Sequence, residues 1–123
     1  MVTGNQNTDR PDRLSAQRKT VDGIRFVTVQ GEIDHTVKDT LTKALLSEDD
    51  TTAPLRIVAD LSGVTFMDSS GINAFIAVHQ QVNSPQGWLR IAGAQESVLH
   101  VLALVGVDTL IPCHPTVEQA LNS

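Results

Sequence analysis

The residues best suited to chemistry in this chain stand together in the segment 65–76, which contains Asp68, Ser69 and Ser70. Upstream, residues 55–61 form a short apolar run typical of a buried strand, and downstream apolar residues recur at three- and four-residue intervals, as in a helix. A carboxylate and two hydroxyls therefore stand where a strand gives way to a helix. The first backbone N–H groups of a helix lack internal partners and carry the positive end of its dipole, so negative charge and phosphate are favoured there.

Ordinary helix capping is one interpretation of this segment. Asp and Ser are preferred N-cap residues, and loss of such a cap costs about 1 kcal/mol. Here Asp68, Ser69 and Ser70 offer three capping side chains where one is enough, and Gly71, a poor residue for a helix interior, follows them. This redundancy favours a second role for one hydroxyl. The small residue at position 71 is expected to leave room for another protein to approach.

Residues 66–72, Phe-Met-Asp-Ser-Ser-Gly-Ile, resemble the signature of bacterial anti-sigma factor antagonists, the small single-domain STAS proteins. A second segment, residues 29–34 (Val-Gln-Gly-Glu-Ile-Asp), resembles the family's strand that ends in Gly-Glu-apolar-Asp. Residues 102–108 and 116–121 are similar to the family's last two helices and the turn between them. The likeness covers roughly residues 24–121.

This resemblance implies a function by partner switching. In that family the unphosphorylated antagonist binds an anti-sigma factor that is also a serine kinase, which frees a sigma factor, and phosphorylation ends the interaction. The resemblance implies that Ser69, directly after the aspartate, is the phosphoacceptor and that a protein phosphatase resets the switch. The residues that it places on the partner-binding surface are Asp34, Asp68, Ser70, Gly71, Ile72 and Asn73.

The physical effect of such a modification is readable from the neighbouring charges. A phosphate on Ser69 would add about −1.5 to −2 charges beside Asp68. Asp34 is expected at the start of the neighbouring helix, so like charges would gather on the surface offered to a partner. Because a helix start tolerates negative charge, we predict that phosphorylation blocks the interface and leaves the fold intact.

Length and composition predict one domain. A chain of 123 residues, 41% of them hydrophobic, supports one core and is too short for two ordinary domains. Residues 1–12 lack apolar periodicity and are expected to form a flexible tail before a STAS domain over residues 13–123. The net charge of −5, the scattered Lys and Arg residues and the few aromatic residues argue against a direct nucleic-acid partner.

The cellular setting is also indicated by composition. No apolar stretch approaches the roughly 20 residues that span a bilayer, and the lone Cys113 excludes an internal disulfide. We therefore expect a cytoplasmic protein without a membrane partner, monomeric when free.

The alternation of apolar patterns predicts an α/β fold, a small mixed β-sheet of four to five strands covered by about four helices. The expected strands are 14–20 (at an edge), 24–29, 56–61, 88–92 and 110–111. The first two helices are expected to begin at Asp34 and near Ser69, the third to cover 95–104, and the last to contain Pro115 in its first turn. The third is expected to end at a left-handed Gly106 and to bury Val98, Leu99, Val101, Leu102 and Val105.

The motifs typical of catalysis and of metal binding are absent from the sequence. A serine nucleophile needs a base and oxyanion donors, but the Gly-x-Ser-x-Gly elbow is absent and His79 lies on the apolar stripe of its helix. Metal-ligand spacings such as His-Glu-x-x-His and Cys-x2-Cys are absent too, so we expect no enzyme, no metal and no cofactor. A STAS scaffold or a nucleotide-sensing module with other protein partners remains the alternative.

Overall fold

A five-stranded mixed sheet organises the protein. The computed structural model describes residues 14–46, 55–83 and 86–122, and within them the strand order is β1-β2-β3-β4-β5. β1 and β2 form an antiparallel hairpin, and each later neighbouring pair is parallel. The strands are β1 (Leu14–Val21), β2 (Ile24–Ile33), β3 (Arg56–Met67), β4 (Trp88–Ala92) and β5 (Cys113–His114).

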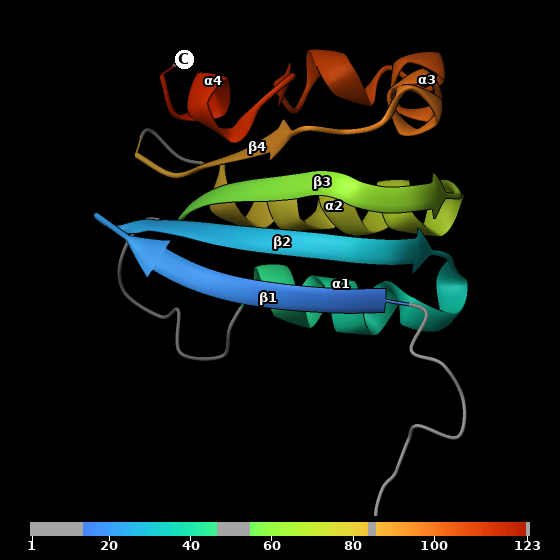
Figure 1. Ribbon diagram of the computed structural model, residues 1–123, viewed down its shortest axis with the longest axis horizontal. Coiled ribbons are helices and arrows are strands. Elements are labelled where there is room, and N and C mark those ends of the chain that lie inside the picture. Colours follow the sequence, from blue (N-terminus) through green and yellow to red (C-terminus); the bar gives the residue numbers. More distant parts are fainter. Residues whose placement is uncertain (1–13, 47–54, 84–85, 123) are drawn as a thin grey trace, which may run out of the picture.

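Helices alternate with the parallel strands. α1 connects β2 to β3, α2 connects β3 to β4, and both lie on the same face of the sheet, behind β1 to β3 in Figure 1. α3 and α4 lie beside β4 at the other margin of the sheet (Figure 1). The helical segments are η2 (His35–Val37), α1 (Lys38–Leu45), α2 (Ser69–Val82), α3 (Glu96–Leu104), η3 (Val107–Thr109) and α4 (Val117–Leu121).

The main core lies between the sheet and the pair α1 and α2. Alternate residues of β2, and of β3 as far as Leu61, point to this side, as the two-residue period of a strand requires. A second, smaller cluster on the opposite face joins Val58 and Ala92 to Ala120 of α4. Fully buried side chains of the main core include Val27, Val29, Leu41, Ile57, Leu61, Phe75 and Val78.

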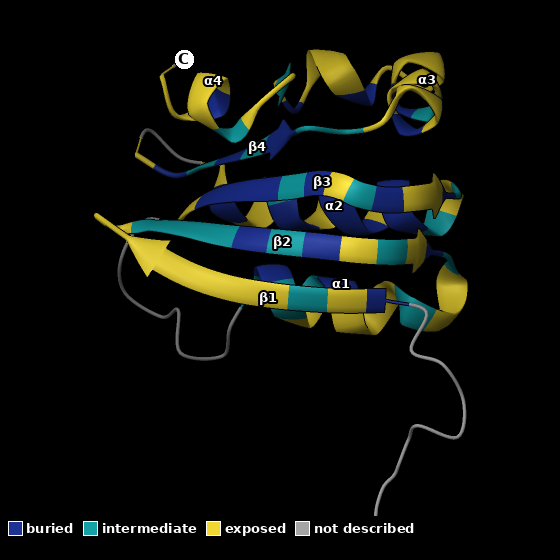
Figure 2. Cartoon of the chain, in the orientation of Figure 1, coloured by how far each residue is buried: buried dark blue, intermediate teal, exposed yellow. Residues whose placement is uncertain are grey.

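The face of β1 and β2 that points away from α1 carries no helix from the described part of the chain (Figure 1). Figure 2 shows β1 largely exposed and β2 with a mixture of exposed, intermediate and buried positions. An antiparallel sheet can expose one face to water, and the backbone of β1 is hydrogen-bonded to β2 along one edge. At the carboxyl ends of β2 and β3, Glu32 and Phe66 are exposed, whereas the terminal residues Ile33 and Met67 are buried.

Most expected elements are confirmed. β4 has the bounds expected, the edge strand over 14–20 is β1, and the α/β class with a mixed sheet is confirmed. β2 and β3 run further than the expected ranges 24–29 and 56–61. Polar and glycine residues interrupt the apolar pattern there, but pairing between the two strands continues.

Three details at the carboxyl end of the chain were expected wrongly. The last strand is Cys113–His114, not 110–111, because the residues before it form η3 and its cap. Pro115 precedes the N-cap Thr116 and so lies outside the last helix. Leu99 and Val105 are 39% and 56% exposed, because α3 packs through only one narrow stripe.

Other expectations for the third helix hold. Val98 and Leu102 are buried and Val101 packs against the core. Gly106 has a φ of 77°, as expected of a left-handed residue at a helix end. The tail expected over residues 1–12 lies outside the described residues.

Candidate functional site

The candidate site lies at the carboxyl ends of two neighbouring parallel strands, β2 and β3. Their last residues, Ile33 and Met67, are partners in register, and each is followed directly by an aspartate. The backbone N–H of Asp68 donates to the carbonyl of Ile33 at 3.1 Å. This bond ties the two strand ends together, so Asp34 and Asp68 emerge from the same edge of the sheet.

Each aspartate caps the helical segment that follows it. The Oδ1 of Asp68 accepts from the backbone N–H of Ser70 at 2.8 Å, at the start of α2. The Oδ1 of Asp34 accepts from the backbone N–H of Thr36 at 3.0 Å and from its hydroxyl at 2.6 Å. The expected place of Asp34 at a helix start is therefore confirmed, although the first turn is a 3₁₀ helix.

Ser69 is the first residue of α2, and its side chain is exposed. The cap is made by Asp68, so the structure assigns the Ser69 hydroxyl no part in starting the helix. Ser70 is half-buried and Asn73 is exposed on the same first turns. Of the three adjacent polar residues, Ser69 is thus the one most accessible to another protein.

Gly71 and Ile72 lie inside the protein. A Cβ at position 71 would stand 2.5 Å from Cγ2 of Ile33 and 2.7 Å from Cγ of Met67. The expectation that Gly71 leaves room for another protein is therefore wrong, because side chains of this chain fill that room. Ile72 is only 5% exposed. Both residues hold the first turn of α2 against the strand ends from below.

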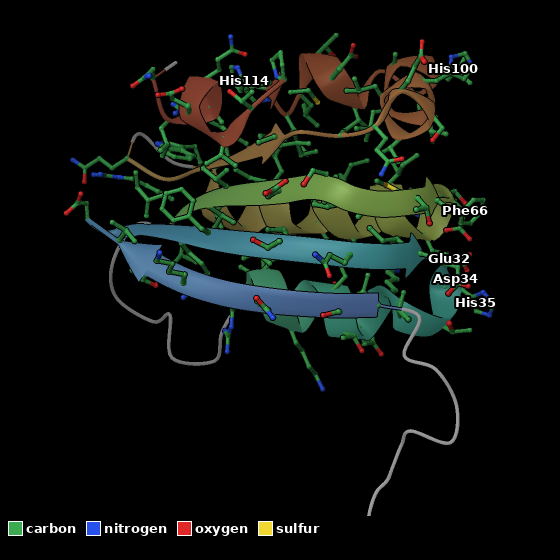
Figure 3. All side chains as sticks on the ribbon, viewed as in Figure 1. Glu32, Asp34, His35, Phe66, His100 and His114 are labelled. Carbon is green, nitrogen blue, oxygen red and sulfur yellow. The ribbon has the colours of Figure 1, made fainter. Side chains whose placement is uncertain are left out.

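Phe66 is a residue of this edge that the sequence reasoning left out of the site. Its side chain is 49% exposed, although it belongs to the apolar end of β3. Figure 3 shows Phe66 at the same end of the sheet as Glu32, Asp34 and His35. The signal was present in the sequence, because Phe66 opens the quoted motif, but an apolar strand residue is normally expected in the core.

Other side chains that could react or bind a metal lie away from this edge. The thiol of Cys113 donates to the carbonyl of Ile111 at 3.4 Å, and burial, aided by the charge of Asp108, raises the pKa of Cys113 to about 11. His79 Nδ1 and His114 Nε2 are buried without a hydrogen-bond partner in the described structure. No cluster of three or more potential metal ligands occurs within residues 14–46, 55–83 and 86–122.

None of the helices in the described part of the chain combines the length and the apolar character needed to cross a membrane.

Known anti-sigma factor antagonists are similar to this chain in sequence and in structure. The anti-sigma F factor antagonist of Paenibacillus polymyxa is 24% identical over 100 residues, which cover 81% of this chain and 86% of that protein. The crystal structure of an anti-sigma factor antagonist from Mycobacterium paratuberculosis is similar with a TM-score of 0.81 and 27% identity, covering 92% and 95% of the two chains.

The same fold occurs within much larger proteins. The murine Solute Carrier 26 family member A9 anion transporter matches with a TM-score of 0.71 and 15% identity, over 84% of this chain and 18% of the transporter chain. That identity shows a shared fold alone. The family model for the STAS domain matches residues 15–120, which include the described strands apart from Leu14 and the last helix apart from Leu121. With its mixed sheet, the aspartates that cap the helical segments after β2 and β3, and this match, the chain belongs to the STAS domain family.

Proposed function

We propose that this protein is an anti-sigma factor antagonist that is switched off when an anti-sigma factor with serine kinase activity phosphorylates Ser69. The observation that carries the proposal is the division of roles at the start of α2. Asp68 caps the helix, while the exposed Ser69 hydroxyl stands beside it and is not used by the cap. A kinase can therefore esterify this hydroxyl without breaking the contact that starts α2. The antagonist relatives support the class of partner.

In the unphosphorylated state the protein binds the anti-sigma factor and thereby frees a sigma factor. Ser69 lies within the interface, and Asp34, Asp68, Ser70 and Asn73 surround it, since all are at least partly exposed at this edge. Gly71 and Ile72 contribute by shaping the first turn rather than by direct contact. The effect on transcription is indirect, takes place in the cytoplasm and needs no nucleic-acid contact. A protein phosphatase restores the active form.

In the phosphorylated state the interface is blocked by charge and bulk. The phosphate brings about −1.5 to −2 charges next to Asp68, and Asp34 stands on the adjoining strand end. These like charges have to be desolvated together when a partner docks, which is costly unless each is paired. The partner's complementarity to the bare hydroxyl is lost at the same time.

Phosphorylation of the purified protein tests the proposal. The protein is incubated with ATP and each candidate anti-sigma factor kinase of the source organism, and the modified residue is located by mass spectrometry. We expect one phosphate on Ser69, none in Ser69→Ala, and a phosphate still located on Ser69 in Ser70→Ala, which lacks the neighbouring hydroxyl. Phosphate on Ser70 would move the acceptor, and the absence of phosphate with every kinase would contradict the proposal.

Binding of the same variants separates the switch from simple modification. Ser69→Ala should bind the kinase and stay bound when ATP is added, because it lacks the acceptor hydroxyl. Ser69→Asp should bind weakly, because it carries a permanent negative charge. Titration with ATP or GTP alone distinguishes a nucleotide sensor, for which micromolar binding with protection of residues 68–72 would be observed.

A further inference from the structure

Phe66 is highly exposed and follows a shift in the pairing register between β2 and β3. Among the exposed large apolar residues of the described structure, it is the only aromatic one, at 49% exposure. Gly31 pairs with Val64, whereas the next residue, Glu32, pairs with Phe66. Thr65 is therefore an extra residue on β3, which is the definition of a β-bulge.

The bulge determines which way the aromatic ring points. Val64 is buried against α1 and α2, so strict alternation would turn Thr65 outward and Phe66 inward. The extra residue reverses this order, because Thr65 and Phe66 are both exposed and Met67 is buried. The strand therefore places an apolar methionine in the core and presents an aromatic ring to solvent at the functional edge.

The surroundings of Phe66 are acidic. In the segments 32–39 and 64–73 the acidic residues are Glu32, Asp34, Asp39 and Asp68, and the only Lys or Arg is Lys38. Figure 3 shows Glu32, Asp34 and Phe66 gathered at one end of the sheet. Basic residues stand at the opposite end of the same strands, where Arg25 is the second residue of β2 and Arg56 the first residue of β3.

We propose that Phe66 is the apolar anchor of the partner-binding surface, inserted into an apolar pocket on the anti-sigma factor whose bordering Lys and Arg residues pair with Glu32 and Asp34 and leave none to pair with a phosphate on Ser69. The identity of this partner rests on the proposed function. Protein interfaces draw most of their affinity from a few buried aromatic or arginine residues, and a charged rim around them steers association and selects the partner. The exposed ring of Phe66 supplies the anchor, and the acidic residues around it supply the charged rim. Ser69 lies on the first turn after the same strand, so anchor and switch share one interface.

The proposal makes different predictions for affinity and for association rate. Phe66→Ala should weaken binding of the unphosphorylated protein about tenfold or more, mainly through faster dissociation. Raising the salt concentration from about 0.05 to 0.5 M should slow association with the partner for the wild type and for Phe66→Ala alike, because salt screens the acidic rim. Leu121→Ala is the matched control, since Leu121 is 37% exposed on α4, which lies toward the other end of the sheet in Figure 1. It should bind within about twofold of the wild type.

The experiment first identifies whatever touches this position in the cell. Full-length protein carrying the photocrosslinker p-benzoylphenylalanine in place of Phe66, or in place of Leu121, is expressed in the source organism and irradiated. The protein joined at position 66 is identified and purified. Its affinity for the wild type, Phe66→Ala and Leu121→Ala is then measured by calorimetry, with urea denaturation as a check that each variant is folded.

A crosslink specific to position 66, together with selective loss of affinity in Phe66→Ala, supports the anchor. The anchor is overturned if no crosslink is specific to position 66, or if Phe66→Ala binds the purified partner as tightly as the wild type. The two proposals fail separately. A partner that needs Phe66 but does not phosphorylate Ser69 would overturn the proposed function alone, and a Ser69 kinase indifferent to Phe66 would overturn the anchor alone.

Discussion

At the scale of single residues, capping of α2 and presentation of an exposed hydroxyl fall to two neighbouring residues of one motif, Asp68 and Ser69. Asp68 accepts a hydrogen bond that the helix needs, and Ser69 presents a hydroxyl that the helix does not use for its cap. Sequence reasoning recognised the excess of capping groups at this point. It left open whether Asp68 or Ser69 was the cap, because both residue types suit that position and the choice depends on backbone geometry.

The division between Asp68 and Ser69 has a measurable consequence for stability. Asp68→Ala should lower the free energy of unfolding by about 1 kcal/mol, because it removes the N-cap acceptor of α2. Ser69→Ala should lower it by less than about 0.5 kcal/mol, as is usual for an exposed position. Urea denaturation of both variants gives these values. Equal losses in the two variants would show that Ser69 shares the capping role.

The second residue-scale prediction concerns Cys113. Burial and the charge of Asp108 raise the pKa of this thiol to about 11, so it stays protonated at neutral pH. We expect slow alkylation by iodoacetamide at pH 7, accelerating as the pH rises toward 11, whereas protein unfolded in urea should react much faster. Mass spectrometry of timed samples measures the rate.

The same raised pKa makes stability depend on pH. Because the folded pKa exceeds the unfolded one, the contribution of Cys113 is complete below the unfolded value and is lost as the pH rises through about 11. Stability of Cys113→Ala should fall less over that alkaline range. Rapid alkylation of folded wild type at pH 7 would contradict the assigned burial.

At the scale of elements, the contact between α2 and the strand ends explains the glycine of the motif. The first turn of α2 approaches Ile33 and Met67 so closely that only a hydrogen fits at position 71. Helix propensity alone favours alanine over glycine by about 1 kcal/mol, so packing must outweigh propensity here. The sequence showed the glycine but not the neighbours that require it.

Replacement of that glycine is therefore expected to destabilise the fold. Gly71→Ala should cost about 1–3 kcal/mol, because the added methyl overlaps the β-branched, fully buried Ile33 and the nearly buried Met67. Asn73→Ala, an exposed change in the same helix, is the control and should stay within about 0.5 kcal/mol of the wild type. Urea denaturation measures both. A Gly71→Ala protein of undiminished stability would mean that the first turn shifts easily.

The boundaries of helices and strands were predictable where one hydrophobic period runs through a segment. They were less predictable where contacts with other elements determine the boundary. The run Trp88–Ala92, apolar except for Arg90, defined the ends of β4 correctly, and Asp34 marked the start of the first helical segment. The bulge at Thr65 could not be foreseen, because it is defined by the pairing of β3 with β2 and has no residue signature of its own. That is why Phe66 was missed.

At the scale of the whole molecule, the fold brings the two capping aspartates to one end of the sheet. Parallel pairing of β2 and β3 brings Asp34 and Asp68 together from distant parts of the sequence, as the resemblance to known antagonists led us to expect. The opposite ends of the same strands carry Arg25 and Arg56. The net charge of −5 is thus distributed unevenly, and this distribution would orient the proposed partner, if it is basic, toward the edge that carries Ser69.

The central prediction at this scale is that phosphorylation changes recognition without changing the fold. A phosphate on Ser69 lies at the positive end of the α2 dipole, an interaction worth about 0.3–1 kcal/mol, and repulsion from Asp68 offsets part of it. The free energy of unfolding should therefore change by less than about 1 kcal/mol. Binding to the anti-sigma factor should weaken by about a hundredfold or more, because the added charge is desolvated only in the complex.

Fully phosphorylated protein, prepared with the cognate kinase, allows both quantities to be measured on one sample, by urea denaturation and by calorimetry. Treatment with a phosphatase is the control and should restore binding without altering the unfolding midpoint. A loss of several kcal/mol in stability would show that the modification acts by disrupting α2 and its cap. Unchanged affinity would instead show that Ser69 lies outside the interface, since a doubly charged group cannot be buried against a partner at no cost.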